Sequence, residues 1–222
     1  MKNKIGHISF IMDGNNRWSK LNNIDLTTSY KKGADILFKI VDRCFFYHNI
    51  NYVSAFALSA HNLSRPKKLI SPIIKLLDFY LDEFLKNNSK YKYNIRFIGN
   101  LDFFKIKTRT KLDIINNQNE HSKTLILALN YSGTQDIIQA ADLLKHNKNL
   151  KINFSDLLST SHYPNPDILI RTGGYKRLSD FFLFEMNFTE LFFLNTLWPN
   201  LTNRSVDAIV SKYLKIERKF GK

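Results

Sequence analysis

An α/β domain, with a mostly parallel central sheet flanked by helices, is the fold class that the sequence predicts. Short runs rich in β-branched and aromatic residues alternate along the chain with longer segments of helical periodicity. The chain of 222 residues is long enough for one sizeable domain. It shows no internal repeat, no Pro/Gly-rich linker and no low-complexity tail. Residues 1–222 are therefore predicted to form a single domain.

The first half of the chain alternates strand and helix. Residues 7–12 are largely apolar and end at a polar turn, which predicts a buried strand. Residues 30–47 place apolar side chains at every third or fourth position, as a helix does. The β-branched and aromatic residues of 51–58 favour a second strand. Residues 68–86 then carry the wide apolar stripe of a helix packed on a core.

The second half repeats this pattern. A third strand is expected over 94–98, before the turn-forming pair Gly99-Asn100. The remaining elements are expected as helix 105–116, strand 123–130, helix 134–146, strand 167–171 and helix 204–219, the last capped by Thr202 or Asn203. Helices between strands predict parallel βαβ units with helices on both faces of the sheet. In such sheets ligands bind at the carboxyl ends of the strands.

A candidate phosphate-binding segment follows the first predicted strand. Residues 13–18, Asp-Gly-Asn-Asn-Arg-Trp, combine a carboxylate, a glycine that permits close backbone approach, and a guanidinium. One or two carboxylates together with substrate phosphate oxygens are the ligands that Mg²⁺ prefers. A plain turn is the alternative interpretation, since Asp, Gly and Asn all favour turns.

A second such segment follows the fifth predicted strand. It contains Arg171, the pair Gly173-Gly174, Arg177 and Ser179. Guanidinium groups bind phosphate oxygens in a bidentate way and glycines allow close contact, so this combination suits a diphosphate. Two anion sites at strand ends predict an enzyme that handles two phosphorylated substrates.

Two further features are open to more than one interpretation. The polar loop 59–66 is either the lead-in to a helix or a segment that turns Asn62 and Arg65 toward a reaction centre. His61 in the same loop is interpreted as a solvated side chain rather than a general base. Glu190 is either a carboxylate on a half-exposed element or a second metal ligand, contributed by a neighbouring subunit.

The bulk composition bounds the partners and the compartment. The formal net charge is +14, but the basic residues are scattered and no nucleic-acid-binding motif accompanies them, so no nucleic-acid partner is expected. A single cysteine, Cys44, excludes an internal disulfide and a cysteine-based zinc site. No signal peptide or membrane span is predicted, so a cytoplasmic protein is expected. The 18 phenylalanines could fill a core or line a long hydrophobic cleft.

Taken together and in this order, these segments resemble the cis-prenyltransferases, the family of bacterial undecaprenyl diphosphate synthase. The similarity covers nearly the whole chain. It rests on blocks within residues 7–18, 59–66, 129–133, 167–179 and 190–199, and on the ending 217–221. Several blocks in the correct order are far more specific than any one motif.

The resemblance implies a fold, an activity and partners. The fold would be a single α/β domain, usually a homodimer, with a hydrophobic tunnel floored by the sheet. The reaction would be a Mg²⁺-dependent condensation of isopentenyl diphosphate units onto an allylic diphosphate, typically farnesyl diphosphate, with each new double bond cis. The product would be a long-chain polyprenyl diphosphate such as undecaprenyl diphosphate for the cell-wall carrier lipid. Delivery of that product to the membrane allows a peripheral location at its inner face.

The resemblance also implies roles for individual residues. Asp13 would hold Mg²⁺ with help from Glu190, and Asn62 would act with Asp13 in catalysis. Substrates would be bound by Gly14, Asn15, Asn16, Arg17, Trp18, Ser59, Arg65, Arg171, Arg177 and Ser179. The allylic diphosphate would bind to the residues of the first segment, 13–18, and isopentenyl diphosphate to those of the second, 171–179.

Several positions depart from the family pattern. The family usually has glycine at Asn16, arginine and histidine at Leu26 and Tyr30, glutamate and tryptophan at His61 and Leu63, and glutamate at Tyr175. The arginine and histidine would donate to the allylic diphosphate, and a charge-assisted hydrogen bond contributes about 1.5–3 kcal/mol. Two alternatives therefore stay open: a divergent member with another primer or a short product, and a non-catalytic subunit of a heteromeric prenyltransferase.

Overall fold

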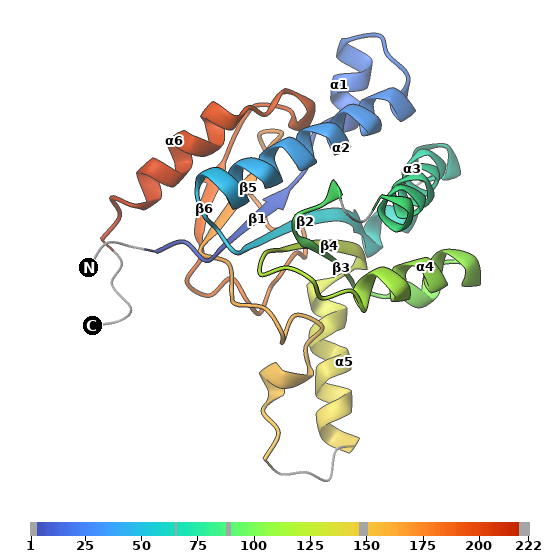
Figure 1. The fold of residues 1–222 in the computed structure, drawn as a ribbon, viewed down its shortest axis with the longest axis vertical. Coiled ribbons are helices and arrows are strands. Elements are labelled where there is room, and N and C mark those ends of the chain that lie inside the picture. Colours follow the sequence, from blue (N-terminus) through green and yellow to red (C-terminus); the bar gives the residue numbers. More distant parts are fainter. Residues whose placement is uncertain (1–3, 65, 88–89, 147–150, 218–222) are drawn as a thin grey trace.

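A six-stranded sheet forms the centre of the computed structural model, which describes residues 4–64, 66–87, 90–146 and 151–217. The strand order is β3-β4-β2-β1-β5-β6, and every neighbouring pair is parallel (Figure 1). The strands are β1 (His7–Ile11), β2 (Tyr52–Ser59), β3 (Asn94–Ile98), β4 (Thr124–Tyr131), β5 (Ile168–Arg171) and β6 (Glu190–Phe193). The predicted α/β fold with a parallel sheet is therefore confirmed.

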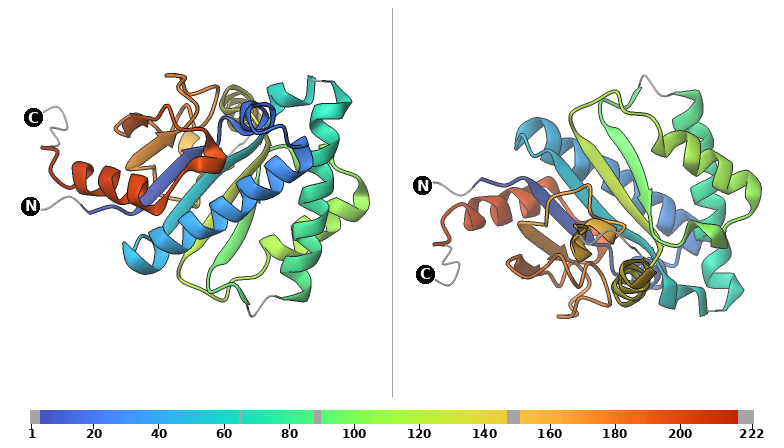
Figure 2. Two further views of the ribbon diagram at one scale, coloured as in Figure 1. Left: turned by 90° about the horizontal axis from the view of Figure 1, so that it is seen from above. Right: turned by 90° about the horizontal axis from the view of Figure 1, so that it is seen from below.

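One face of this sheet is covered by helices. The α-helices of the described residues are α1 (Asn15–Leu21), α2 (Leu26–Asp42), α3 (Lys67–Lys86), α4 (Ile106–Asn116), α5 (Gly133–His146) and α6 (Asn203–Tyr213). The helices that cover this face are α2, α3, α4 and α6. Figure 2 shows α2 lying across the strands. Side chains of α2, α3, α4 and α6 pack with strand residues such as Ile8, Phe10 and Val53 in the main hydrophobic core. None of the helices in the described ranges has the length and apolar content that crossing a bilayer requires.

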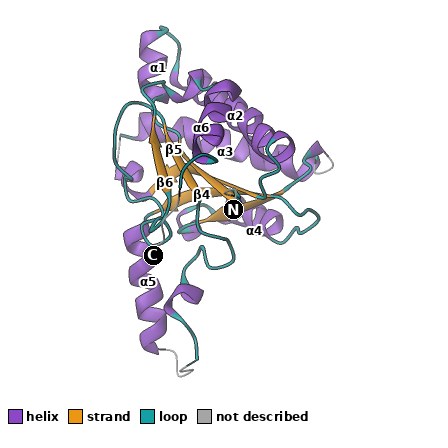
Figure 3. Ribbon diagram, turned by 90° about the vertical axis from the view of Figure 1, so that its left-hand side faces the viewer, coloured by secondary structure: helices purple, strands orange, loops and turns teal. Residues whose placement is uncertain are grey.

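The opposite face carries a smaller core. There Ile126 and Leu169 pack against Phe181, Phe182 and Met186, which follow β5 in the chain. Loop side chains thus cover much of the face on which the sequence predicts helices, and Figure 3 shows α5 extending away from the other helices. The reason is the aromatic content of the loop, because large rings bury enough apolar area to replace a helix.

Two short elements differ from the sequence prediction. The predicted turn 13–18 becomes α1, because tertiary contacts support its poor helix formers: the Ser29 hydroxyl donates to the carbonyl of Asn15. The strand β6 lies within a segment of the chain for which no strand is predicted. Short elements that depend on neighbours leave weak local signals.

The bounds of two predicted helices also differ. α2 begins at Leu26 rather than residue 30, because the side chain of Asp25 accepts a hydrogen bond from the Thr28 amide and caps it. The helix then continues through 43–47 as a π-helical turn. The last helix ends at Tyr213, and residues 218–222 lie outside the described ranges.

Buried polar side chains on β1 and β2 form a series of hydrogen bonds beside the smaller core. His7 Nδ1 donates to the carbonyl of Pro164 at 2.7 Å, and Nε2 accepts from the hydroxyl of Ser54 at 2.9 Å. The hydroxyls of Ser54 and Ser9 are 2.5 Å apart. Burial disfavours the charged imidazolium and lowers the pKa of His7 to about 4, although the bond to Pro164 acts in the opposite direction. His7 is therefore neutral in the folded protein at pH 7.

This lowered pKa predicts a loss of stability in acid. The unfolded chain takes up a proton at His7 near pH 6.5, whereas the folded chain resists protonation until about pH 4. The contribution of His7 is thus fully present above pH 6.5 and is lost as pH falls toward 4. Between pH 7 and pH 5, urea unfolding should show that the wild type loses about 2 kcal/mol more than His7→Gln. Parallel pH profiles of the two proteins would contradict this account.

Candidate active site

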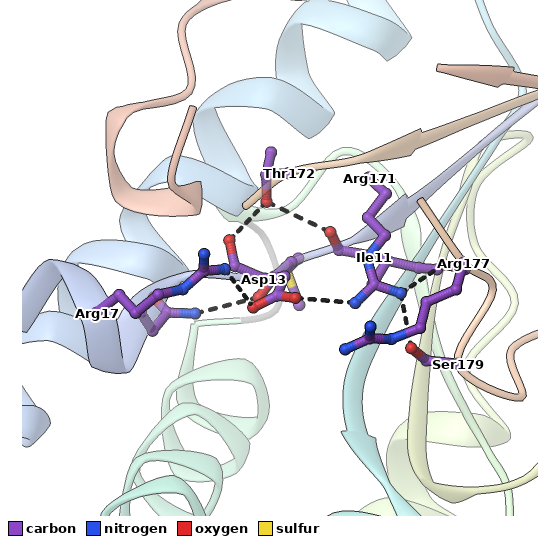
Figure 4. Close-up of polar contacts among 9 residues, drawn as sticks. Ile11, Asp13, Arg17, Arg171, Thr172, Arg177 and Ser179 are labelled. Carbon is purple, nitrogen blue, oxygen red and sulfur yellow. Dashed lines mark hydrogen bonds and ion pairs between the residues drawn. The ribbon is translucent and has the colours of Figure 1, made fainter. Parts of the chain in front are cut away.

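The two predicted phosphate-binding segments meet at the carboxyl edge of the sheet. β1 and β5 are neighbours, and Ile11 pairs with Arg171 at their ends. The Thr172 hydroxyl donates to the carbonyl of Asp13 at 2.8 Å (Figure 4). The Thr172 amide donates to the carbonyl of Ile11 at 3.2 Å. These bonds hold the two segments side by side although they are far apart in the sequence.

A single carboxylate joins the segments electrostatically. Asp13 Oδ1 lies 3.1 Å from Nη2 of Arg17, and Asp13 Oδ2 lies 2.9 Å from Nη2 of Arg171 (Figure 4). The Arg171 side chain is 3% exposed, whereas that of Arg17 is 43% exposed. The Arg171 ion pair is therefore the better shielded of the two, because exposed pairs are weakened by solvent.

The other side of Arg171 organises the second segment. Its Nη1 donates to the hydroxyl of Ser179 at 2.6 Å and to the carbonyl of Arg177. Both ends of one guanidinium fork are thus used, one toward Asp13 and one toward this loop. Arg171, Arg177 and Ser179 all line one cavity, and their binding of a diphosphate stays a prediction.

Glycines are required at two close approaches in the site. Gly173 has a φ of 85°, and a Cβ there would collide with the guanidinium of Arg17 and approach Asp13 Cβ to 3.1 Å. Gly14 has a φ of 118°, and a Cβ there would lie 2.9 Å from the side chain of Leu197. Only glycine adopts these conformations without strain and leaves the space free.

A cavity of about 760 Å³ is lined in part by the charged side chains of Asp13, Arg17 and Arg171. Its apolar wall comes from α2, α3 and strands β2, β3 and β4, through Leu37, Phe38, Ile73, Leu76, Leu77, Phe97, Leu127 and Leu129. Leu81 on α3 is instead fully buried in the main core. The apolar stripe of α3 therefore serves both purposes that the sequence left open, core and cleft, and the sheet forms one wall of the cleft.

Most of the predicted site residues line this cavity. They are Asp13, Gly14, Asn15, Asn16, Arg17, Ser59, Asn62, Arg171, Arg177 and Ser179. Asn62 is held in place by its backbone amide, which donates to the Ser59 hydroxyl at 3.1 Å. Tyr30, one of the departures from the family pattern, lines the cavity as well. Arg65 lies outside the described residues.

Trp18 and Glu190 are placed differently from the rest. The indole of Trp18 donates to the side chain of Asn200 at 2.9 Å, so it supports α1 rather than lining the cavity. Glu190 is the first residue of β6. It pairs with Ile168 on the parallel strand β5, and Ile168 lies three residues before Arg171. Within one chain it therefore lies at the amino edge of the sheet, roughly 10 Å along the strands from the charges at the carboxyl edge. A role for Glu190 beside Asp13 remains a prediction that needs a second copy of the chain.

Asp180 is a residue that the sequence does not single out. Its carboxylate accepts from the hydroxyl of Ser132 at 2.5 Å, and from the amide and hydroxyl of Thr134 at 2.9 and 2.7 Å. Burial disfavours its ionisation, but these hydrogen bonds outweigh that effect and lower its pKa. Asp180 thereby ties the start of α5 to Ser179, and both residues have left-handed backbones, with φ of 67° and 54°. The one sequence signal for this role of Asp180 is its position directly after Ser179, because aspartate tolerates a left-handed backbone conformation.

Loss of this carboxylate should destabilise the protein. Asp180→Ala removes three hydrogen bonds and puts alanine in a left-handed conformation, so urea unfolding should show a loss of about 3 kcal/mol. Asp180→Asn keeps an acceptor for Thr134 and tolerates the backbone, so it should lose less than half as much. Equal losses in the two variants would contradict the importance of the backbone conformation.

The fold and the site together define a class of protein. It is an α/β protein in which a carboxylate and three arginines at the carboxyl edge of a parallel sheet line the same cavity as many apolar side chains. The family model described as "Putative undecaprenyl diphosphate synthase" matches residues 11–221. The chain therefore belongs to the undecaprenyl diphosphate synthase family of isoprenyl transferases, as its motifs predict.

Individual relatives agree with this assignment. The isoprenyl transferase of Campylobacter jejuni is 34% identical over 99% of this chain and 100% of its own length. The ditrans,polycis-undecaprenyl-diphosphate synthase ((2E,6E)-farnesyl-diphosphate specific) of Buchnera aphidicola is 33% identical over 99% of this chain and 92% of its own length. A crystal structure from Campylobacter jejuni, described as "a probable undecaprenyl diphosphate synthase", has a TM-score of 0.83 and 32% identity, and covers 99% of this chain and 100% of that one.

Proposed function

We propose that the protein is a cis-prenyltransferase that condenses isopentenyl diphosphate units onto an allylic diphosphate, farnesyl diphosphate, and makes undecaprenyl diphosphate. The observation that carries the proposal is the position of Asp13 between Arg17 and Arg171, at the mouth of the apolar cavity. A polar mouth suits the diphosphates and an apolar interior suits a growing hydrocarbon. The family membership and the activities named for the relatives support the same reaction.

The allylic substrate belongs to the first segment. Breaking its C–O bond leaves negative charge on the departing diphosphate, so catalysis must stabilise that charge. Arg17 and the backbone amides of 14–16 lie at the mouth and would bind the phosphate oxygens. The hydrocarbon would extend between α2 and α3, where side chains such as Leu37 and Leu77 exclude water.

Magnesium is part of the proposal, and the residues present fit it in one specific way. Among the described residues, Asp13 is the only carboxylate that lines the cavity, and these residues contain no cluster of three or more metal-ligating side chains. One carboxylate suits Mg²⁺ when substrate phosphate oxygens complete its coordination. Asp13 would hold the ion, which when bound would neutralise charge on the leaving diphosphate.

Isopentenyl diphosphate belongs to the second segment. Arg171, Arg177 and Ser179 would bind its diphosphate and so position its alkene against the allylic carbon. Asn62 faces the same cavity and would orient the reacting groups as a proton leaves the new carbon chain. Arg65 would assist it. Each role is a proposal for these positions.

The proposal extends to the assembly and location of the enzyme. We infer a cytoplasmic homodimer, to which Glu190 would contribute across the subunit contact, and delivery of the product at the inner membrane face. The amino-edge position of Glu190 is compatible with a metal role only in such an assembly. Gel filtration with light scattering would test the dimer.

A product analysis tests the function. The purified protein is incubated with labelled isopentenyl diphosphate, farnesyl diphosphate and Mg²⁺, and the products are separated by chain length. Undecaprenyl diphosphate is expected as the main product, with no product after chelation of the metal. Extension of a shorter primer instead would correct the proposed substrate. Absence of any extended product with every allylic primer would overturn the enzymatic function and favour a non-catalytic subunit.

A further inference from the structure

Three guanidinium groups surround one aromatic ring at the mouth of the cavity. The carbon at the centre of each guanidinium lies over the ring of Tyr175, at 4.2 Å for Arg177, 5.0 Å for Arg17 and 5.8 Å for Arg171. All three distances are within the range of a cation–π interaction. Tyr175 also lines the cavity, and 45% of its surface is exposed. It is one of the positions at which the sequence departs from the family pattern.

Two consecutive glycines with left-handed backbones precede Tyr175 and determine where its ring lies. Gly173 and Gly174 both have left-handed conformations, with φ of 85° and 82°. Their amides donate to the carbonyls of Thr196 and Leu194, both at 2.8 Å, which fixes the turn against the segment that follows β6. The chain therefore bends back after β5, and Tyr175 faces the guanidinium of Arg171 four positions earlier.

The electrostatics of the site require such a group. Three arginines carry three positive charges and Asp13 carries one negative charge, which leaves a local charge of two (3 − 1 = 2). The arginines repel one another, because Coulomb repulsion at these separations is appreciable in a partly shielded site. An aromatic ring offsets the repulsion through its negative face, and the ring of Tyr175 lies within cation–π distance of all three guanidiniums. The ring itself takes none of the guanidinium N–H groups, whereas a carboxylate at this position would compete for them.

We propose that Tyr175 is a positioning residue that gathers Arg17, Arg171 and Arg177 before substrate binds and thereby sets the affinity of the site for diphosphate groups. The inference rests on the proposed function, since it assumes that the site binds diphosphates. It assigns the effect to the aromatic face rather than to the phenol hydroxyl.

Binding of inorganic pyrophosphate to the full-length protein tests this role. Isothermal titration calorimetry compares the wild type with Tyr175→Leu, which removes the ring, and Tyr175→Phe, which keeps it. Tyr175→Leu should bind pyrophosphate about tenfold more weakly, and Tyr175→Phe should stay within about twofold of the wild type. The KM for isopentenyl diphosphate should rise in the same proportion, with a smaller effect on kcat. Tyr175→Met provides a second ring-less variant, and thermal unfolding checks that each protein is folded.

Tyr47 supplies a matched control. Its ring lies 3.2 Å from the guanidinium of Arg43, and it is 64% exposed on the π-helical turn that follows α2, away from the cavity. Tyr47→Leu should leave pyrophosphate binding unchanged. Wild-type affinity in Tyr175→Leu, or an equal loss in Tyr175→Phe, would overturn the inference while leaving the proposed function intact. Failure of the wild type to bind pyrophosphate would overturn the inference alone, whereas absence of turnover with every allylic primer would overturn the proposed function as well.

Discussion

Asp13→Asn is expected to lower kcat by about a thousandfold or more, with a smaller change in the KM for either substrate. An asparagine has nearly the same shape, but its neutral amide is a poor ligand for Mg²⁺ and no longer neutralises the two guanidiniums. Asp13 is also the only carboxylate that lines the cavity, so no described neighbour there can replace it. The measurement is steady-state turnover of labelled isopentenyl diphosphate at saturating Mg²⁺.

The control separates this effect from the loss of an ion pair in general. Asp102 pairs with Arg109 at 2.7 Å on the surface, with 83% of its side chain exposed. Asp102→Asn should therefore keep wild-type kcat, because exposed ion pairs contribute little. Thermal unfolding should show that Asp13→Asn is folded. More than a tenth of wild-type activity in folded Asp13→Asn would remove Asp13 from the catalytic machinery.

Arg171→Lys is expected to raise the KM for isopentenyl diphosphate about a hundredfold, although the charge is retained. The guanidinium of Arg171 reaches Asp13 with one nitrogen and Ser179 with the other. A lysine ammonium is a single point and cannot make both bonds, so the loop that carries Ser179 loses its anchor. Losing interactions that total about 3 kcal/mol corresponds to roughly a hundredfold in affinity.

Arg109→Lys is the matched control, because Arg109 also pairs with an aspartate but does so on the surface. Its KM should stay at the wild-type value. Calorimetry with pyrophosphate should show the same hundredfold loss for Arg171→Lys, which separates weaker binding from slower chemistry. An unchanged KM in folded Arg171→Lys would contradict the assignment of Arg171 to diphosphate binding.

Local residue types predicted much of the fold. Runs of β-branched and aromatic residues located the five longer or more buried strands to within about one residue, because such side chains favour pleated, buried surfaces. The short strand β6 and the helix α1 were not predicted. Asn15, Asn16 and Trp18 are weak helix formers, and α1 exists because Gly14, Ser29 and Asn200 support it from outside.

The candidate site, like the fold, depends partly on the sequence alone and partly on the tertiary structure. The sequence by itself determined which chemical groups are available, since it places a carboxylate, paired glycines and arginines directly after predicted strands, a combination suited to anions. Only the tertiary structure decided how they combine. Parallel pairing of β1 with β5 brings Asp13 to Arg171 across 158 positions, and pairing of β5 with β6 places Glu190 at the opposite edge. The loop after β5 brings Tyr175 to Arg177 and Asp180 to Thr134. The physical reason is that these contacts depend on strand register and backbone reversal, which long-range packing sets and local propensity does not.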